Sequence, residues 1–285
     1  MMDGRTRNGG QLLMDSLVAL GATRGFGVPG ESYLAVLDAM VDHANAFDLV
    51  LCRQEGGAAY MAAAWGKLTG EPGLCFVTRG PGATNATVGI HTAMQDSVPM
   101  ILFVGQVGTD VMGREAFQEV DYTAFFGPLA KWAVQIDHVD RVPEIISRAW
   151  TVAMSGRPGP VVVALPEDML VGTSDRLPCD PVTIPEPAVP EAAAAQMAGM
   201  LAAAERPVML VGGTRWTSGS ARALESFSAV NDVPVVAAFR FHDIIDNHCP
   251  SFVGDAGVAM NAYMKDLLRQ ADLIVAINIR FGEST

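Results

Sequence analysis

Short apolar runs and amphipathic segments alternate along the whole chain, and this alternation limits the fold to few classes. The strand-like runs lie at 26–28, 48–52, 74–78, 100–104, 132–136 and 160–165. Helical periodicity separates them, at 10–20, 32–43, 55–68, 81–95 and 142–154. The run at 48–52 is typical of a buried strand. Short strands that alternate with longer helices predict an α/β fold, in which a parallel sheet is covered on both faces.

A proline-rich stretch from Pro166 to Pro190 interrupts this alternation and is typical of an extended linker. After it, strands are expected only at 207–211, 234–238 and 272–277. Three parallel strands leave an exposed apolar edge, so this second domain is expected to be incomplete. The prediction is two doubly wound parallel-sheet domains, at 1–170 and 191–285, joined by a linker at 171–190.

Charge and cysteine content exclude several classes of partner. The 285 residues include 19 Lys and Arg against 31 Asp and Glu, a net charge of −12, which disfavours nucleic acid and anionic lipid. We expect no membrane span, because no apolar run approaches the roughly 20 residues that one needs. The four cysteines have neither metal-ligand spacing nor a disulfide pattern, so we expect free thiols, no bound metal and a cytoplasmic protein.

The segment Gly25-Phe-Gly27-Val-Pro-Gly30 matches the spacing of a dinucleotide-binding loop. That motif requires a buried strand before its first glycine, whereas a polar segment precedes Gly25. Pro29 also removes one backbone donor that a pyrophosphate would need. A tight loop at a strand end is the favoured interpretation.

Three other segments contain side chains suited to chemistry, each after a strand-like run. In Arg53-Gln-Glu55-Gly-Gly57, the small residues beside Glu55 would let a flat ring approach its carboxylate. The other interpretation of Glu55 is an acid that merely favours a helix N-terminus. Thr78–Asn85 is either a ligand-binding turn or only a Gly-Pro turn. Glu115–Glu119 follows a long glycine-containing loop, and long loops in compact α/β domains are often functional.

Together these residues resemble a known family. The chain contains, in order, Val28-Pro-Gly30, Arg53-Gln-Glu55-Gly, Thr78-Arg-Gly-Pro-Gly-Ala-Thr-Asn85, Gln95-Asp-Ser-Val-Pro99, Gly105-Gln106, Ala116-Phe-Gln-Glu119, Lys131-Trp132 and Ser155-Gly-Arg-Pro-Gly-Pro160. This series is similar to the N-terminal pyrimidine-binding domain of thiamine diphosphate enzymes related to acetolactate synthase, pyruvate oxidase and benzoylformate decarboxylase. It is dense over 10–170, and a looser similarity to the family's central domain extends beyond it.

The resemblance implies a role for each matching residue. Glu55 would be catalytic, because its carboxyl would hydrogen-bond N1′ of the cofactor's aminopyrimidine and so activate the cofactor toward a 2-oxo acid. The residues implied beside the cofactor are Pro29, Gly30, Gly82 and Asn85. Those implied on the substrate side are Phe117, Gln118 and Lys131. The family also implies self-association as a dimer or tetramer.

The chain departs from the family in two ways. Gln54 and Arg79 stand where acetolactate synthases usually have His and Ser, which puts the product in doubt. The Mg²⁺ and diphosphate motif of the family's C-terminal domain is missing, so the chain would be about half an enzyme, inactive alone, that needs a separate C-terminal half. The alternative is a non-catalytic or regulatory thiamine-type binding protein. FAD or another nucleotide at Gly212-Gly213 is a further prediction.

Overall fold

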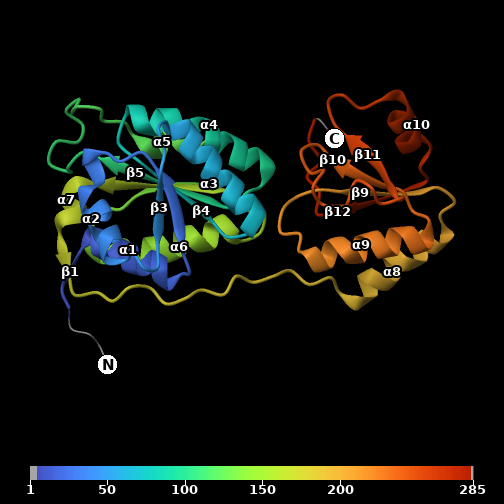
Figure 1. The fold of residues 1–285 in the computed structure, drawn as a ribbon, viewed down its shortest axis with the longest axis horizontal. Helices are drawn as coiled ribbons and strands as arrows, with labels where there is room; N and C mark the ends of the chain where they lie inside the picture. Colours follow the sequence, from blue (N-terminus) through green and yellow to red (C-terminus); the bar gives the residue numbers. More distant parts are fainter. Residues whose placement is uncertain (1–4, 284) are drawn as a thin grey trace. The chain divides into compact units, whose positions relative to one another are not determined.

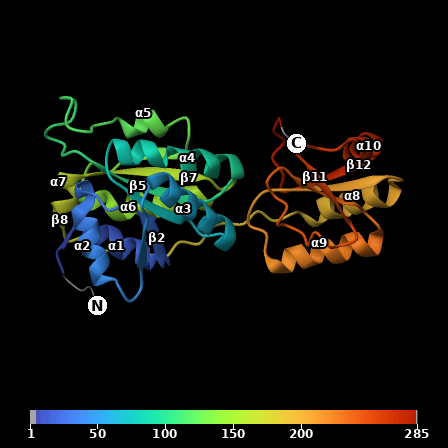
Figure 2. The same ribbon diagram turned by 45° about the horizontal axis from the view of Figure 1, so that its top comes forward.

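The computed structural model describes residues 5–283 and residue 285. The chain divides into two compact units, one that ends at Pro185 and one that begins at Glu186. Each unit has its own parallel sheet with helices on both faces (Figures 1 and 2). The prediction of two doubly wound α/β domains is confirmed.

The first unit is built on a six-stranded parallel sheet with the order β3-β2-β4-β5-β7-β6. Its strands are β2 (Arg24–Gly27), β3 (Asp48–Leu51), β4 (Gly73–Val77), β5 (Met100–Gln106), β6 (Trp132–Gln135) and β7 (Pro160–Pro166). The helices on one face are α1 (Gly9–Ala19), α2 (Leu34–Asp42), α6 (Val142–Met154) and α7 (Glu167–Val171), with the short turns η1 (Glu31–Tyr33) and η2 (Val139–Arg141) beside them. Those on the other face are α3 (Glu55–Thr69), α4 (Pro81–Asp96) and α5 (Tyr122–Phe126).

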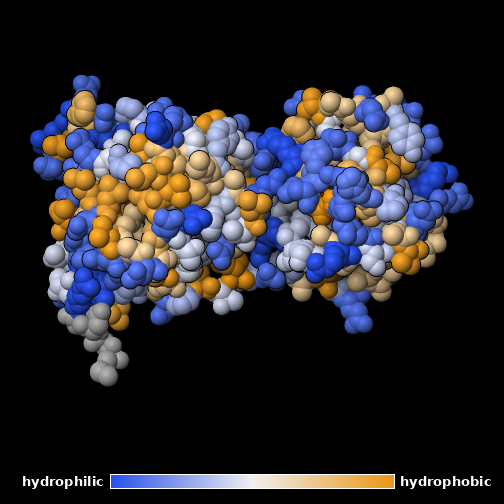
Figure 3. All heavy atoms as spheres, viewed as in Figure 1, coloured by the Kyte–Doolittle hydropathy of each residue, from blue (hydrophilic) through white to orange (hydrophobic). Residues whose placement is uncertain are grey.

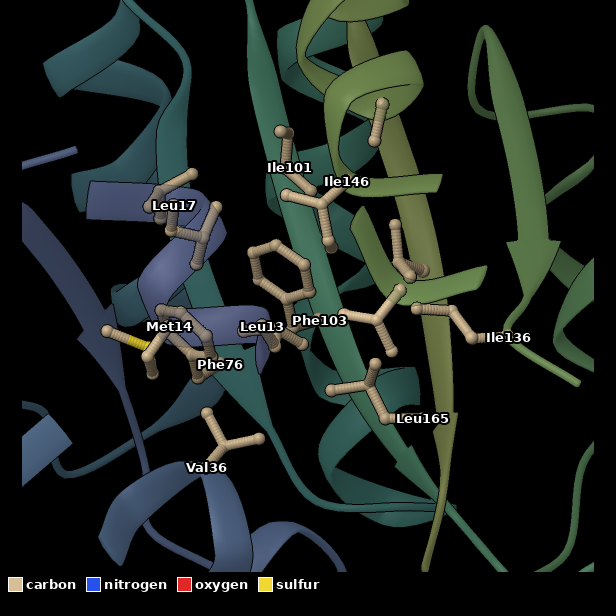
Figure 4. Close-up of a cluster of buried hydrophobic side chains, with 14 of the residues drawn as sticks. Leu13, Met14, Leu17, Val36, Phe76, Ile101, Phe103, Ile136, Ile146 and Leu165 are labelled. Atoms are coloured by element: carbon tan, nitrogen blue, oxygen red, sulfur yellow. The ribbon is translucent and has the colours of Figure 1, made fainter. Parts of the chain in front are cut away.

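Alternation along the central strands explains why both faces are covered. In β4, Phe76 points into the core beneath α1 and α6, whereas Cys75 belongs to the core beneath α3 and α4. Phe76 and Phe103 stack with their ring centroids 4.8 Å apart, among Leu13, Met14 and Ile146 (Figure 4). A strand that is apolar at every position can be buried only between two layers of helices.

β3 differs from its prediction, because it is not buried. It forms the edge of the sheet and pairs only with β2, and its end residues Asp48 and Leu51 are exposed. Its sequence is apolar enough for a central strand, but the strand order leaves it with a neighbour on one side. Glu55 therefore begins a helix that follows an edge strand.

The segment predicted to be an extended linker begins with regular structure. After β7 the chain forms α7, and then Thr173–Ser174 (β8) pairs antiparallel with Arg7–Asn8 (β1). Val182 and Ile184 also pack against the core of the first unit. The division between the two units lies after Pro185.

The second unit contains a four-stranded parallel sheet with the order β11-β10-β9-β12. Its elements are α8 (Glu191–Ala203), β9 (Pro207–Val211), α9 (Ser218–Asn231), β10 (Val235–Ala238), β11 (Phe252–Ala256), α10 (Ala262–Gln270) and β12 (Leu273–Ile277). The expectation of three strands is wrong, because β11 was not predicted. Gly254 and Asp255 lie in this strand, and both residue types are depleted in strands. These two residues therefore hid the strand pattern in the sequence.

Candidate active site

The turns after β2, β3 and β4 meet at the carboxyl edge of the first sheet. The chain passes from β2 outward to β3 and then returns to β4 on the other side of β2. In open parallel sheets, ligands bind in the crevice outside such a reversal of strand order. The segments around Gly30, Glu55 and Gly80 directly follow these three strands. Strand order thus gathers residues that are far apart in sequence.

Glu55 is the first residue of α3, and its side chain is partly exposed. The amide Nδ2 of Asn85 donates a hydrogen bond to Glu55 Oε2 at 2.9 Å. The other carboxylate oxygen, Oε1, lies beside Gly82, where an added Cβ would be 3.6 Å away. The N-terminus of the helix is capped, because the side chain of Gln54 accepts a hydrogen bond from the amide of Gly57 at 2.8 Å. Glu55, Gly82 and Asn85 therefore lie together.

The turn after β2 is joined tightly to the turn after β4. A Cβ at Gly30 would lie 2.4 Å from Thr78 Cβ, so only glycine allows this approach. The hydroxyl oxygens of Ser32 and Thr78 are 2.9 Å apart. Tyr33 donates from its hydroxyl to the carbonyl of Val28 at 2.7 Å, and burial raises the pKa of that hydroxyl. The turn that contains Pro29 and Gly30 is thus held firmly against the turn after β4.

The loop that contains Phe117 and Gln118 packs against the same turn. Gly80 has a φ of +54°, and a Cβ there would lie 2.7 Å from Gln118 Cβ. The amide of Gly80 donates to the hydroxyl of Tyr122 at 2.7 Å. The side chain of Phe117 is 72% exposed. Phe117 and Gln118 therefore stand next to the turn that leads into α4 and on to Asn85.

Arg79 is a site residue whose role the sequence did not show. Its Nη2 donates to Glu31 Oε1 at 2.8 Å, Nη1 donates to Glu167, and Nε donates to the carbonyl of Phe117 at 3.1 Å. Beside this group is a cavity of about 420 Å³ lined by Arg79, Val107, Gly108, Val111, Arg114, Ala116, Phe117 and Glu167. Its lining is mixed, with apolar side chains and ionic groups of both signs.

Lys131 does not join these residues. It directly precedes β6, so it lies at the amino edge of the parallel sheet, opposite the edge that Glu55 follows. Its Nζ donates to the carbonyl of Ser155 at 2.8 Å and to that of Val152, both at the end of α6. Burial, together with the positive charge of Arg157, lowers the pKa of this ammonium. Within the first unit Lys131 holds a helix end.

Two family models match the chain. The N-terminal domain of thiamine pyrophosphate enzymes, which binds that cofactor, matches residues 7–125. The central domain of the same enzymes matches residues 194–285. The chain belongs to the thiamine pyrophosphate enzymes.

Within this family the chain is similar to large subunits of acetolactate synthase. It is 33% identical to acetolactate synthase isozyme 2 large subunit of Escherichia coli (strain K12), over 97% of this chain and 50% of that protein. It is 34% identical to the probable acetolactate synthase large subunit of Methanocaldococcus jannaschii, over 96% of this chain and 47% of that protein. The mitochondrial acetolactate synthase catalytic subunit of Saccharomyces cerevisiae is 31% identical over 96% of this chain and 42% of that protein. The chain spans about half the length of these curated relatives.

The residues that the structure describes include no group of three or more His, Cys, Asp or Glu side chains that could hold a metal ion. Across residues 5–283 and 285, no helix is both long and apolar enough to cross a membrane. Cys52, Cys75, Cys179 and Cys249 are free thiols.

The glycine pair after β9 is explained by the chain itself. Gly213 has a φ of +71°, and a Cβ there would lie 2.3 Å from the carbonyl oxygen of Asn278. Asn278 Nδ2 donates to the carbonyl of Thr214 at 2.7 Å. The segment after β12 thus approaches the Gly212-Gly213 turn so closely that glycine is required at position 213.

Proposed function

We propose that this chain is the cofactor-activating part of an acetolactate synthase-like enzyme that acts on 2-oxo acids. The observation that supports this most directly is the arrangement of Glu55. Its carboxylate follows a strand end at the reversal of strand order, with Oε2 held by Asn85 and Oε1 beside Gly82. A side chain at position 82 would fill the space that a planar ring needs in order to reach Oε1.

The residues present fit the aminopyrimidine side of thiamine diphosphate. That cofactor, when bound, supplies a carbon nucleophile for the 2-oxo acid and an electron sink for the loss of CO₂. Glu55 would hydrogen-bond the ring nitrogen N1′ and hold a proton there, while Asn85 keeps the carboxylate oriented. Pro29 and Gly30 would wall the ring, and Phe117 and Gln118 would face the substrate.

The diphosphate end of the cofactor needs other residues. We propose that Mg²⁺ and the diphosphate bind to a C-terminal diphosphate-binding half rather than to these 285 residues. The net charge of −12 also opposes a free diphosphate anion. The chain alone should therefore bind thiamine diphosphate only at millimolar concentrations, near −4 kcal/mol, and should not turn over substrate.

Self-association is part of the same proposal. The neighbouring helices α3 and α4 expose large apolar side chains: Tyr60 (46%), Met61 (47%), Val88 (45%) and Leu68 (84%). In Figure 3, apolar residues are visible on the face of the first unit that is turned toward the viewer. Several exposed apolar side chains on neighbouring helices favour an interaction site. We propose that this apolar face joins two copies in a symmetric dimer, from which a tetramer can form.

Flavin binding in the second unit is not favoured by a specific observation. Gly213 is required by the approach of Asn278, so the glycine pair alone does not indicate FAD. Flavin absorbance in the purified protein would show that FAD binds nevertheless. The four free thiols support a reducing compartment, and we propose the cytoplasm.

Complementation tests the proposed function. The chain is mixed with a separately expressed diphosphate-binding half of a relative, thiamine diphosphate and Mg²⁺, and pyruvate consumption is measured. Wild-type chain should give turnover, and Glu55→Gln should reduce it at least about a hundredfold, because the acid–base group is lost. Glu71→Gln, at an exposed acid beyond the end of α3, is the matched control and should keep full turnover.

The following results would contradict the proposal. Near-wild-type turnover with Glu55→Gln would remove Glu55 from the chemistry. Calorimetric titration of the chain alone that gave micromolar affinity, or any turnover without the added half, would place a diphosphate site within these residues. Binding of the cofactor to the complemented pair without turnover would favour the non-catalytic alternative.

A further inference from the structure

The largely buried side chain of Arg79 contacts three other parts of the first unit. The exposed fraction of its side chain is only 11%, although arginine is rarely buried. Glu31 belongs to η1 after β2, Glu167 opens α7 after β7, and Phe117 belongs to the loop between β5 and α5. Arg79 itself follows β4, so its guanidinium links four segments at the carboxyl edge of the sheet.

Each nitrogen of this guanidinium is used in the protein. Nη1 and Nη2 each donate to a carboxylate, and Nε donates to the Phe117 carbonyl. The guanidinium carbon also lies 6.0 Å from the centroid of the Phe117 ring, within range of a cation–π contact. Three of its five N–H donors face protein acceptors, so Arg79 is placed to hold the loop. Only a planar fork with several fixed donors can make these contacts at once.

The loop beyond Gln106 is shaped by contacts of its own. The Glu119 carboxylate accepts from the amides of Gly113 and Ala116, at 2.6 and 3.0 Å. Gln106 Nε2 donates to the carbonyl of Val120 at 2.8 Å. These contacts fix the form of the loop. The Arg79–Phe117 bond and the contacts of Gly80 with Gln118 and Tyr122 fix the loop against the turn that leads to α4.

We infer that Arg79 is a positioning residue that couples the substrate-side loop to the cofactor-side turn. By its hydrogen bond to the Phe117 carbonyl, Arg79 fixes the positions of Phe117 and Gln118 relative to Gly82 and Asn85. The assignment of the loop to the substrate and of the turn to the cofactor rests on the proposed function. The coupling between loop and turn is a property of this chain.

Hydrogen exchange of the full chain tests the coupling without any cofactor. The readouts are the Gly80 amide, which donates to Tyr122 only while the loop is docked, and the amides of 113–122. Arg79→Ser and Arg79→Lys should both raise the exchange rates at these amides at least about tenfold. Neither side chain has the planar set of N–H donors that holds the Phe117 carbonyl in place. The amides of β10, in the second unit, should keep their wild-type rates.

Arg24→Ser is the matched control. Arg24 also pairs with an acid, Asp48 at 3.2 Å, and its guanidinium lies 5.4 Å from the Trp65 ring, but at the opposite edge of the sheet. It should leave the Gly80 amide unchanged. If Arg79→Ser does not fold, Glu167→Gln provides a milder loss of the same network and should raise exchange at Gly80 by a smaller factor.

Unchanged exchange at Gly80 in Arg79→Lys would overturn the inference, because charge alone would then hold the loop. Equal acceleration in Arg24→Ser would overturn it as well, since the effect would be global. Neither outcome depends on turnover. A failure of the complementation test at Glu55 would therefore leave the coupling intact, and a failure here would leave the role of Glu55 intact.

Discussion

At the scale of single residues, the ammonium of Lys131 illustrates how a partly buried cation can stabilise a helix end. The last carbonyls of a helix have no intrahelical partners, and a positive charge there also opposes the negative end of the helix dipole. Lys131 meets both needs at the end of α6, through Val152 and Ser155. Its position is explained without any substrate.

Lys131→Met should therefore reduce stability and spare turnover. Loss of the donors to two carbonyls should lower the free energy of unfolding by about 1–3 kcal/mol, measured by urea denaturation. In the complemented assay with pyruvate its kcat and KM should match wild type. Lys265→Met, at an exposed position of α10, is the control and should change neither quantity. Lost turnover with unchanged stability would instead support the substrate-side role that the family resemblance implies.

The sequence predicted the grouping of Glu55 with Gly82 and Asn85, because these residues follow strand ends and match one family's motifs in order. The partners of Arg79 were beyond such reasoning. Glu31 and Glu167 are acids far away in the sequence, and nothing in their local pattern marks them. Only the strand order brings them to the same edge of the sheet.

At the scale of helices and strands, α3 and α4 show how small residues allow close packing. Gly89 in α4 faces α3, and a Cβ there would lie 2.4 Å from the Cβ of Ala59. The helices therefore touch through backbone and small side chains. This contact fixes the spacing between Glu55 at the start of α3 and Asn85 in α4.

Gly89→Ala should force the two helices apart. We expect a loss of about 1–3 kcal/mol in the free energy of unfolding, the usual cost of overpacking. Gly57→Ala is the control, since its nearest neighbour, Gln54 Oε1, is 4.0 Å from an added Cβ. It should be neutral or stabilise by up to about 1 kcal/mol through helix propensity. Urea denaturation of both variants gives the comparison, and equal stability of the two would refute the close contact.

The longer helices and most of the strands of the two sheets were predictable from periodicity, but the short elements and the strand order were not. The β3 sequence predicts burial. The strand nevertheless lies at the edge of the sheet, because the chain returns past β2 and forms β4 on the other side of that strand. β11 was missed because its polar and glycine positions are explained only by pairing with β10. The local sequence pattern predicts whether a segment is a helix or a strand. Which strands lie beside it depends on the topology of the whole sheet.

At the scale of the whole molecule, the first unit combines an acidic chain with an exposed apolar face on α3 and α4. A net charge of −12 keeps copies apart at long range. Burial of apolar side chains acts only at contact, at roughly 25 cal/mol per Å². Association should therefore strengthen with salt, which screens the repulsion.

Sedimentation equilibrium at tens of micromolar should show a dimer or a larger closed oligomer. Met61→Glu on the apolar face should weaken association at least about tenfold, because it buries a charge without a partner. Val230→Glu in α9 is the control, since Val230 is 82% exposed but lies in the second unit. A strictly monomeric wild-type protein under these conditions would exclude the apolar face as a dimer contact.

The coil between the two units also bears on how such chains evolve. Each unit has its own sheet and core, so a recombination event after Pro185 would pass on two intact modules. An event before Val182 would instead remove two side chains that pack on the first core. Gene fusion or fission would therefore disturb the two folded units least if it occurred between Pro185 and the start of α8. A lineage can exchange the second unit there without rebuilding the site around Glu55.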